Sequence, residues 1–154
     1  MILFRQFFDD ASSTLTYLLA DPVTGDAIII DSVKAHLGAY ISFLQEQELQ
    51  LDWVLETHIH ADHITGSAGL CELTGARSAM GRAGAAGCAD RLLGDGDTIV
   101  FGNQVIRVIP TPGHTPGCVT YQWRDRIFTG DALLIGGCRS EERRVGKECP
   151  SLCR

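Results

Sequence analysis

Three histidines and one aspartate fall within six consecutive positions of the stretch T-H-I-H-A-D-H-I-T-G, residues 57–66. Imidazole nitrogens and carboxylate oxygens are the ligands that zinc, iron and manganese take from proteins. A polar loop that caps a helix could hold one solvated histidine, but it has no need of four such groups side by side. The spacing therefore predicts a metal site that involves His58, His60, Asp62 and His63.

A second stretch with a histidine, P-T-P-G-H-T-P-G at residues 110–117, is stiffened by proline and glycine. A loop of that stiffness holds a side chain in place at little entropic cost, which suits a metal ligand. Taken alone, His114 would be incidental to a rigid surface turn. Beside the first cluster, we interpret it as a further ligand of the same site.

Two aspartates stand at the ends of strand-like runs: Asp31 directly after residues 27–30, and Asp131 after residues 126–129 and Gly130. Either acid could simply cap the end of a strand. Asp131 is the better ligand candidate, because its flanking residues carry no other group that is polar enough for a site. His36 lies on an expected helix, and we interpret it as a surface residue.

The elements that must position these groups alternate between strand-like and helix-like patterns. Apolar residues at helical spacing predict one helix from residue 33 and another over residues 64–74, which Gly75 stops. The order of elements predicts an α/β fold in which helices cover sheets. The cluster then lies on a loop between a strand and a helix, with His58 and His60 on one side and Ile59 turned into the core. The expected strands are residues 3–8, 14–20, 27–31, 51–56, 77–80, 98–101, 105–109, 118–123 and 126–129.

The composition is that of one globular domain. The chain has 154 residues, of which 45% are hydrophobic, and a net charge of −6, which argues against a nucleic-acid partner. No apolar run approaches the ~18 residues that a membrane span needs. The first residues lack the pattern of a signal or transit peptide, so we expect a cytoplasmic protein. In that compartment the six cysteines are expected to be buried thiols and not disulfides.

Together, the three stretches resemble the metallo-β-lactamase superfamily, whose signature is H-x-H-x-D-H followed by a later histidine and aspartate. Within it, the chain looks most like the persulfide dioxygenases (sulfur dioxygenases), which are close relatives of glyoxalase II. The resemblance covers residues 4–138 and includes S-T-L-T-Y-L-L, T-P-G-H-T-P-G-C-V-T and F-T-G-D-A-L-L-I-G-G-C. It implies an αββα sandwich with the metal at the edge where the two sheets meet.

The resemblance to persulfide dioxygenases implies one Fe(II) per chain, held by His58, His114 and Asp131 as metal-binding and catalytic residues. A face of two histidines and one carboxylate leaves positions open for O2 and a substrate sulfur. The implied reaction oxidises glutathione persulfide with O2 to sulfite and glutathione. In that role His60, Asp62 and His63 would orient the ligands and hold water. The residues that bind the substrate are not assigned.

Two alternatives remain open at this point. In a dinuclear Zn(II) hydrolase of the hydroxyacylglutathione (glyoxalase II) type, His60, Asp62 and His63 would be ligands, and Asp131 would bridge the metals and activate a water. In a metal-binding or sulfur-sensing module, the same residues would hold a metal without turnover. Ala132, Leu133 and Leu134 favour the dioxygenase, because glyoxalase II more often has Thr-Leu-Phe there. A homo-oligomer is also left open.

Residues 139–154 differ from everything before them. They carry five Lys or Arg and three Glu, and they depart from the family pattern directly after Cys138. They also resemble the conceptual translation of a DNA-sequencing adapter. We therefore expect a truncated domain at residues 1–138, with the first half of the sandwich and only part of the second. Residues 139–154 would be a non-native, disordered tail, and the activity of the fragment would be impaired.

Overall fold

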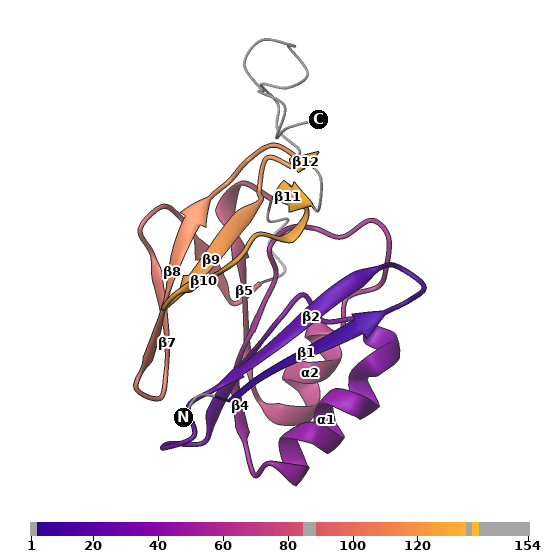
Figure 1. Cartoon of the computed structure of the whole chain (residues 1–154), viewed down its shortest axis with the longest axis vertical. Coiled ribbons are helices and arrows are strands. Elements are labelled where there is room, and N and C mark those ends of the chain that lie inside the picture. The colour runs from indigo at the N-terminus through magenta and orange to yellow at the C-terminus, as the bar shows by residue number, and fades with distance from the viewer. Residues whose placement is uncertain (1–2, 85–88, 135–136, 139–154) are drawn as a thin grey trace.

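Two β-sheets stack face to face, and two α-helices cover the outer face of the larger sheet (Figure 1). The structure is a computed structural model that describes residues 3–84, 89–134 and 137–138. Within these residues the layers run helix, sheet, sheet. The layered α/β class predicted from the sequence is therefore confirmed. The prediction of a disordered tail concerns residues 139–154, which lie outside the described residues.

The larger sheet has its strands in chain order, antiparallel in the first half and parallel in the second. Parallel neighbours need a crossover connection, and the two helices supply it between the third, fourth and fifth strands. The strands are β1 (Leu3–Asp9), β2 (Thr14–Ala20), β3 (Asp26–Ile30), β4 (Gln50–Leu55), β5 (Arg77–Gly81) and β6 (Arg91–Leu93). The sequence pattern did not predict β6, which has only three residues.

Both helices start later than their sequence patterns predicted. Helix α1 (Leu37–Glu46) follows the 3-10 turn η1 (Lys34–His36), and helix α2 (Ser67–Thr74) ends at Gly75, whose φ of 78° is left-handed as expected. The physical reason is a backbone bridge between Val33 and Thr65, reinforced by a hydrogen bond from the Lys34 amide to the carbonyl of Ile64. These extended residues tie the two crossovers together before either helix can begin.

The smaller sheet is antiparallel, and its strands are ordered β10-β9-β8-β7. Its two tight hairpins agree with the hairpins expected from the sequence. Its strands are β7 (Thr98–Phe101), β8 (Gln104–Pro110), β9 (Val119–Trp123) and β10 (Arg126–Phe128). Short elements complete the chain: the 3-10 turns η2 (Arg82–Gly84) and η3 (Gly130–Ala132), and the strand pair β11 (Leu133–Leu134) and β12 (Gly137–Cys138).

Two separate hydrophobic cores hold the layers together. The core between the sheets includes Leu55 of β4 with Tyr121 and Trp123 of β9, all fully buried. The core under the helices includes Ile29 and Tyr40. Because strand side chains alternate between faces, each central strand of the larger sheet contributes to both cores. This explains why β3 is apolar along almost its whole length.

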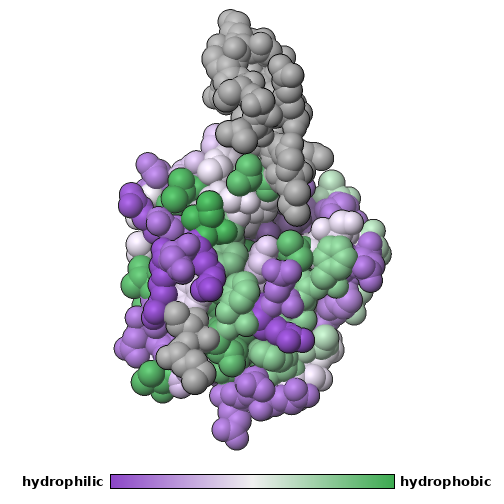
Figure 2. Space-filling view, viewed as in Figure 1, coloured by the Kyte–Doolittle hydropathy of each residue, from purple (hydrophilic) through white to green (hydrophobic). Residues whose placement is uncertain are grey.

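The outer face of the smaller sheet is not covered by any α-helix of the described residues. Val100, Val105 and Ile127 are each more than half exposed there. On the face shown in Figure 2, hydrophobic side chains reach the surface among hydrophilic ones. Neither helix in the described part of the chain is long and apolar enough to cross a membrane.

Candidate metal centre

The histidine loop, residues 56–66, leaves the carboxyl end of the central strand β4 and leads into α2. Hydrogen bonds fix the loop at both ends. The Val119 amide donates to the carbonyl of Thr57, and the Gly66 amide donates to the carbonyl of Ser32. The loop is thus tied to the smaller sheet on one side and to the end of β3 on the other. It holds its polar side chains at the edge of the stacked sheets.

Three side chains from distant parts of the sequence meet at this edge: His58, His114 and Asp131. Nε2 of His114 lies 3.2 Å from Oδ2 of Asp131, and Nε2 of His58 lies 3.7 Å from the same oxygen. All three ligand atoms lie within 4.8 Å of one another. The imidazole of His58 is buried, while the side chains of Asp131 and His114 are 41% and 24% exposed. We call this set the first trio; it is open to solvent on one side.

A second trio, His60, Asp62 and His63, lies beside the first and also brings its ligand atoms within 4.8 Å. Oδ1 of Asp62 lies 3.3 Å from Nδ1 of His63 and 3.9 Å from Nδ1 of His60. The rings of His58 and His60 are 4.1 Å apart between centroids, so the trios are direct neighbours. The structure therefore brings all six predicted residues together.

The donor chemistry of both trios fits a metal ion. Each consists of imidazole nitrogens and one carboxylate, the set that iron and zinc accept. Nε2 of His63 is buried and has no hydrogen-bond partner among the described residues. A buried ring nitrogen without a partner is costly, and a metal ion would satisfy it. The role of the six residues of both trios as metal ligands stays a prediction, and the geometry is compatible with it.

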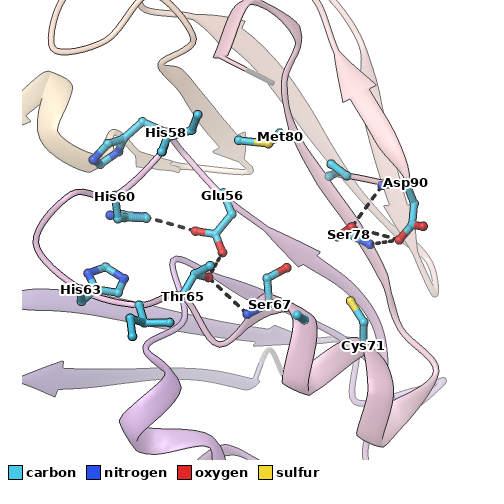
Figure 3. Close-up of a pocket in the computed structure, with 15 residues that line it drawn as sticks. Glu56, His58, His60, His63, Thr65, Ser67, Cys71, Ser78, Met80 and Asp90 are labelled. Carbon is cyan, nitrogen blue, oxygen red and sulfur yellow. Dashed lines mark hydrogen bonds and ion pairs between the residues drawn. The ribbon is translucent and has the colours of Figure 1, made fainter. Parts of the chain in front are cut away.

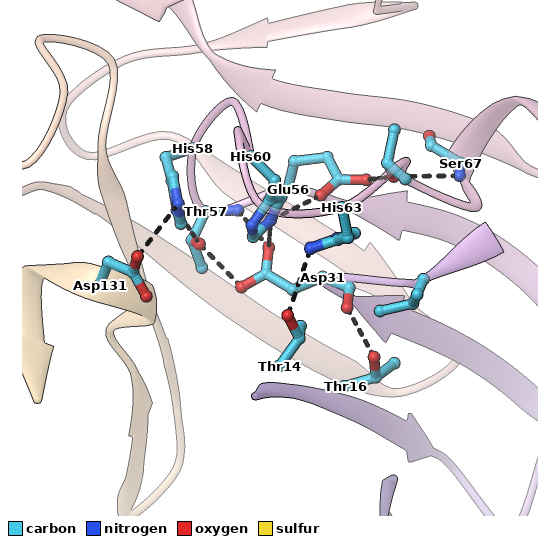
Figure 4. Close-up of polar contacts among 12 residues, drawn as sticks. Thr14, Thr16, Asp31, Glu56, Thr57, His58, His60, His63, Ser67 and Asp131 are labelled. Atoms are coloured by element: carbon cyan, nitrogen blue, oxygen red, sulfur yellow. Dashed lines mark hydrogen bonds and ion pairs between the residues drawn. The ribbon is translucent and has the colours of Figure 1, made fainter. Parts of the chain in front are cut away.

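Asp31 connects the two trios from beneath, as Figure 4 shows. It accepts hydrogen bonds from the amide and the hydroxyl of Thr57, at 2.8 and 2.7 Å, and its Oδ1 lies 3.0 Å from Nε2 of His60. The Thr57 hydroxyl also lies 2.9 Å from Nδ1 of His58. Burial alone would raise the pKa of Asp31, but His60 and the Thr57 donors outweigh it and lower that pKa. Sequence reasoning left Asp31 as a strand cap; its place directly after the apolar strand β3 was the available signal.

Glu56, which the sequence did not single out, is a second buried carboxylate at His60. Its Oε2 lies 3.2 Å from Nε2 of His60, and its Oε1 accepts a hydrogen bond from the Thr65 hydroxyl (Figure 3). Burial, together with the charge of Asp31, raises the pKa of Glu56 to about 7. Burial also opposes charge on His60, yet Asp31 and Glu56 raise its pKa to about 10.

A cavity of about 720 Å³ adjoins the histidine loop and extends between α2 and β5 (Figure 3). Ile59 lines it and is 50% exposed, so the expectation that this side chain turns into the core is wrong. The loop has left the sheet at this point, and no layer of the described residues covers Ile59. The expectation that His58 and His60 share one side is confirmed by their adjacent rings, which are tilted by 49° with centroids 4.1 Å apart.

Two minor expectations are also refined. His36 is not a free surface residue, because its Nε2 lies 2.8 Å from Oδ1 of the largely buried Asp9. Cys71 and Cys118, the cysteines whose side chains the structure describes, are both free thiols. Cys149 and Cys153 lie outside the described residues.

The chain is similar to known proteins over most of its length. It is 45% identical over 148 residues to the human mitochondrial persulfide dioxygenase ETHE1, covering 94% of this chain. It is 36% identical over 135 residues to a hydroxyacylglutathione hydrolase of Cereibacter sphaeroides (strain ATCC 17025), covering 82% of this chain. Among solved structures, ETHE1 from Myxococcus xanthus superimposes with a TM-score of 0.86 at 42% identity, over 89% of this chain.

The chain is shorter than these relatives. It spans 58% of the human protein, 51% of the Cereibacter protein and 60% of the Myxococcus chain. The model of the metallo-beta-lactamase superfamily matches residues 9–148, a range that contains both trios and runs past Cys138. On the strength of that match and of the two stacked sheets with the histidine loop at their edge, the chain belongs to the metallo-beta-lactamase superfamily.

Proposed function

We propose that the first trio is the mononuclear iron centre of a persulfide dioxygenase. The observation that carries this proposal is the convergence of His58, His114 and Asp131, with all ligand atoms within 4.8 Å of one another. Two histidines and one carboxylate on one face of a metal suit non-haem Fe(II) that reacts with O2. The similarity to the human persulfide dioxygenase ETHE1 and to ETHE1 from Myxococcus xanthus supports the substrate class.

In this chemistry the residues of the chain would hold the metal and leave room beside it for two reactants. Burial, with the neighbouring His60, lowers the pKa of His58, so its imidazole is neutral and able to bind a metal at physiological pH. The exposed side of Asp131 leaves space beside the trio for a substrate. When bound, the ferrous ion would supply the electron transfer that O2 needs to react with a sulfur. Overall, glutathione persulfide, O2 and water would give glutathione, sulfite and two protons.

In this proposal the second trio orients the first and does not bind iron. The rings of His60 and His63 are 4.4 Å apart between centroids, and that of His60 is 4.1 Å from His58. Asp62, whose side chain is 47% exposed, faces solvent and could order water beside the substrate. Side groups that orient metal ligands in this way typically contribute a factor of about 10–100 to affinity or activity.

The test is the metal content and the activity of the chain purified without oxygen. We expect about one iron per chain, with oxygen consumption and sulfite formation when glutathione persulfide is added. Asp131→Asn should lose both iron and activity, while Asp125→Asn, which changes an exposed acid of the neighbouring turn, should keep them. Two zinc atoms per chain and no oxygen consumption would overturn the proposal.

A second candidate is a dinuclear zinc hydrolase of glutathione thioesters, as in the hydroxyacylglutathione hydrolase relatives. The specific observation in its favour is the second trio, which is complete and directly beside the first. Hydrolysis of an S-acylglutathione with two zinc atoms bound would establish it. Metal uptake with neither activity would leave the metal-binding or sulfur-sensing module as the function.

Location and assembly are also proposed here. We propose a cytoplasmic protein; the names of the human, mouse and bovine relatives place those proteins in mitochondria. Fractionation of the source cells, with detection of the native chain, tests this. We also propose that the protein can form a homo-oligomer. Light scattering of the purified protein measures the mass of the assembly in solution.

A further inference from the structure

The cavity beside the histidine loop has largely apolar walls, and no step of the proposed reaction uses it. Its volume is about 720 Å³. In Figure 3 the histidines of the loop lie along one side of the cavity, and Ser78 and Asp90 lie along the other. The apolar side chains that line it come from the histidine loop, from α2, and from β5 and the residues after β5: Ile59, Ile64, Ala68, Ala79, Met80 and Ala89.

The cavity connects the protein surface with the back of the first trio. Ile64 at its surface end is 71% exposed, whereas Met80 on β5 is only 6% exposed. His58, a member of the first trio, also lines the cavity, but His114 and Asp131 do not. The first trio can therefore be approached from two sides, past the exposed Asp131 and through the cavity.

The charge and polarity of the cavity suit an apolar molecule better than an anion. Its charged lining groups among the described residues include two acids, Glu56 and Asp90, and no lysine or arginine. Glutathione persulfide carries two carboxylates, which these acids disfavour. O2 is small and apolar, so its transfer from water to apolar surroundings is favourable. Apolar cavities in proteins take up small apolar molecules such as xenon for the same reason.

We propose that this cavity binds O2 and holds it next to His58, while the polar persulfide approaches the first trio past Asp131. The cavity is much larger than one O2 molecule, so it raises the local concentration of O2 and does not fit a single molecule closely. The inference rests on the proposed function, because only the dioxygenase reaction consumes O2. It assigns separate entrances to the two reactants.

NMR of the metal-free chain under O2 pressure tests the binding directly, because O2 is paramagnetic and relaxes the methyl signals that it visits. The methyl of Met80 should be relaxed at least about threefold more strongly than the methyls of Val23, which is 83% exposed, since apolar surroundings favour O2 over water. The methyls of Leu70, which is fully buried and does not line the cavity, should be relaxed least. Relaxation at Met80 no stronger than at Val23 would overturn the proposal.

Ala68→Phe fills the cavity from α2 and should remove the excess relaxation at Met80. Ala39→Phe is the matched control, because Ala39 is an exposed alanine of α1 that does not line the cavity, and it should keep that relaxation. In the iron-loaded chain, Ala68→Phe should raise KM for O2 about 3–10-fold and leave KM for glutathione persulfide unchanged. Excess relaxation that persists in Ala68→Phe, or a rise in KM for the persulfide alone, would contradict the proposal.

Glutathione added to the metal-free wild-type chain tests the other candidate occupant. The methyl signals of Met80 and Ile64 should stay in place, and a shift of both would make the cavity a substrate site and overturn the proposal. These wild-type measurements decide the matter even if Ala68→Phe does not fold. Excess relaxation at Met80 in a chain that binds iron but consumes no O2 with glutathione persulfide would overturn the proposed function and leave O2 binding as a property of the cavity.

Discussion

At the scale of single residues, neighbouring histidines of one loop have opposite environments. Burial, with the adjacent His60, lowers the pKa of His58, whereas two carboxylates outweigh burial and raise that of His60 to about 10. The Thr57 hydroxyl contacts Asp31 and His58 at once and so links the two environments. Residue type does not distinguish these histidines; their partners do.

The division of roles between the trios predicts unequal effects of two alanine substitutions. His114→Ala removes one of three protein ligands and should abolish stoichiometric iron binding. His60→Ala removes an orienting group and should weaken iron binding by about 10–100-fold. Anaerobic iron titration with optical or calorimetric detection measures both. Equal losses in the two variants would contradict the assigned roles, and His36→Ala, outside both trios, serves as the control.

The ion pair of Asp9 and His36 predicts an acid-sensitive contribution to stability. Hydrogen bonds from Ser12, together with His36, lower the pKa of Asp9 to about 2. Because the folded-state pKa lies below the ordinary value of about 3.9, this contribution is present above pH ~4 and is lost as pH falls toward 2. Asp9→Asn should therefore reduce stability near neutral pH and flatten its decline on acidification. Urea unfolding at several pH values measures this, and the exposed neighbour Asp10, changed to Asn, should leave the profile unaltered.

At the scale of elements, three separate loops carry the side chains of the first trio, and close backbone packing holds these loops together. Gly130 precedes Asp131 and has a φ of 52°, a conformation that favours glycine. A Cβ there would clash with the Thr57 hydroxyl oxygen. A Cβ on Gly117, at the end of the loop that carries His114, would clash with backbone atoms of Gly84. Both glycines allow a loop to approach the larger sheet.

Gly130→Ala should therefore weaken metal binding as well as stability. Alanine at positive φ costs about 1–2 kcal/mol, and the methyl group must also displace Thr57 or move Asp131 away from His58. Gly96→Ala is the matched control, because Gly96 has a φ of 76° but nothing within 4 Å of an added Cβ. Thermal unfolding and iron titration of both variants measure the difference. Equal stability loss with unchanged metal binding would show that the contact at Gly130 does not position Asp131.

At the scale of the whole molecule, the stacking of the two sheets places the side chains of the trios next to one another. Tyr121 of β9 is fully buried between the sheets, and its hydroxyl bonds to the backbone of Glu56, where the histidine loop begins. The Val119 amide bonds to Thr57, one residue further along that loop. The smaller sheet thus positions His114 and Asp131 and also braces the loop of the larger sheet.

Residues 139–154 provide a prediction about the molecule as a whole. Their charged sequence has no apolar stripe at helical or strand spacing that could dock on a sheet. Deleting them should change the free energy of unfolding by no more than ~0.5 kcal/mol, the usual range for featureless surface changes. Chemical unfolding of the full chain and of residues 1–138 measures the difference. A larger loss would show that the segment packs on the domain and is native to it.

The sequence alone predicted a metal site and a layered α/β fold, because the spacing of candidate ligands and the periodicity of apolar residues are local properties. His58 and His60 are two residues apart, and the strands and hairpins that carry the site follow alternation and turn residues. The similarity to persulfide dioxygenases rested on the same contiguous stretches. The sequence did not predict the short strand β6 or the first residue of α2, because contacts with distant residues determine both.

The family resemblance already implied the division into two trios, but only the tertiary structure showed which buried acids contact His60. Asp31 and Glu56 stand at the ends of adjacent strands β3 and β4, and parallel pairing places those ends together at His60. The sequence separates them by 25 positions, and nothing in either local pattern marks a shared partner. Long-range strand pairing and burial set the environments of His58 and His60, and neither is encoded in the spacing of these residues along the chain.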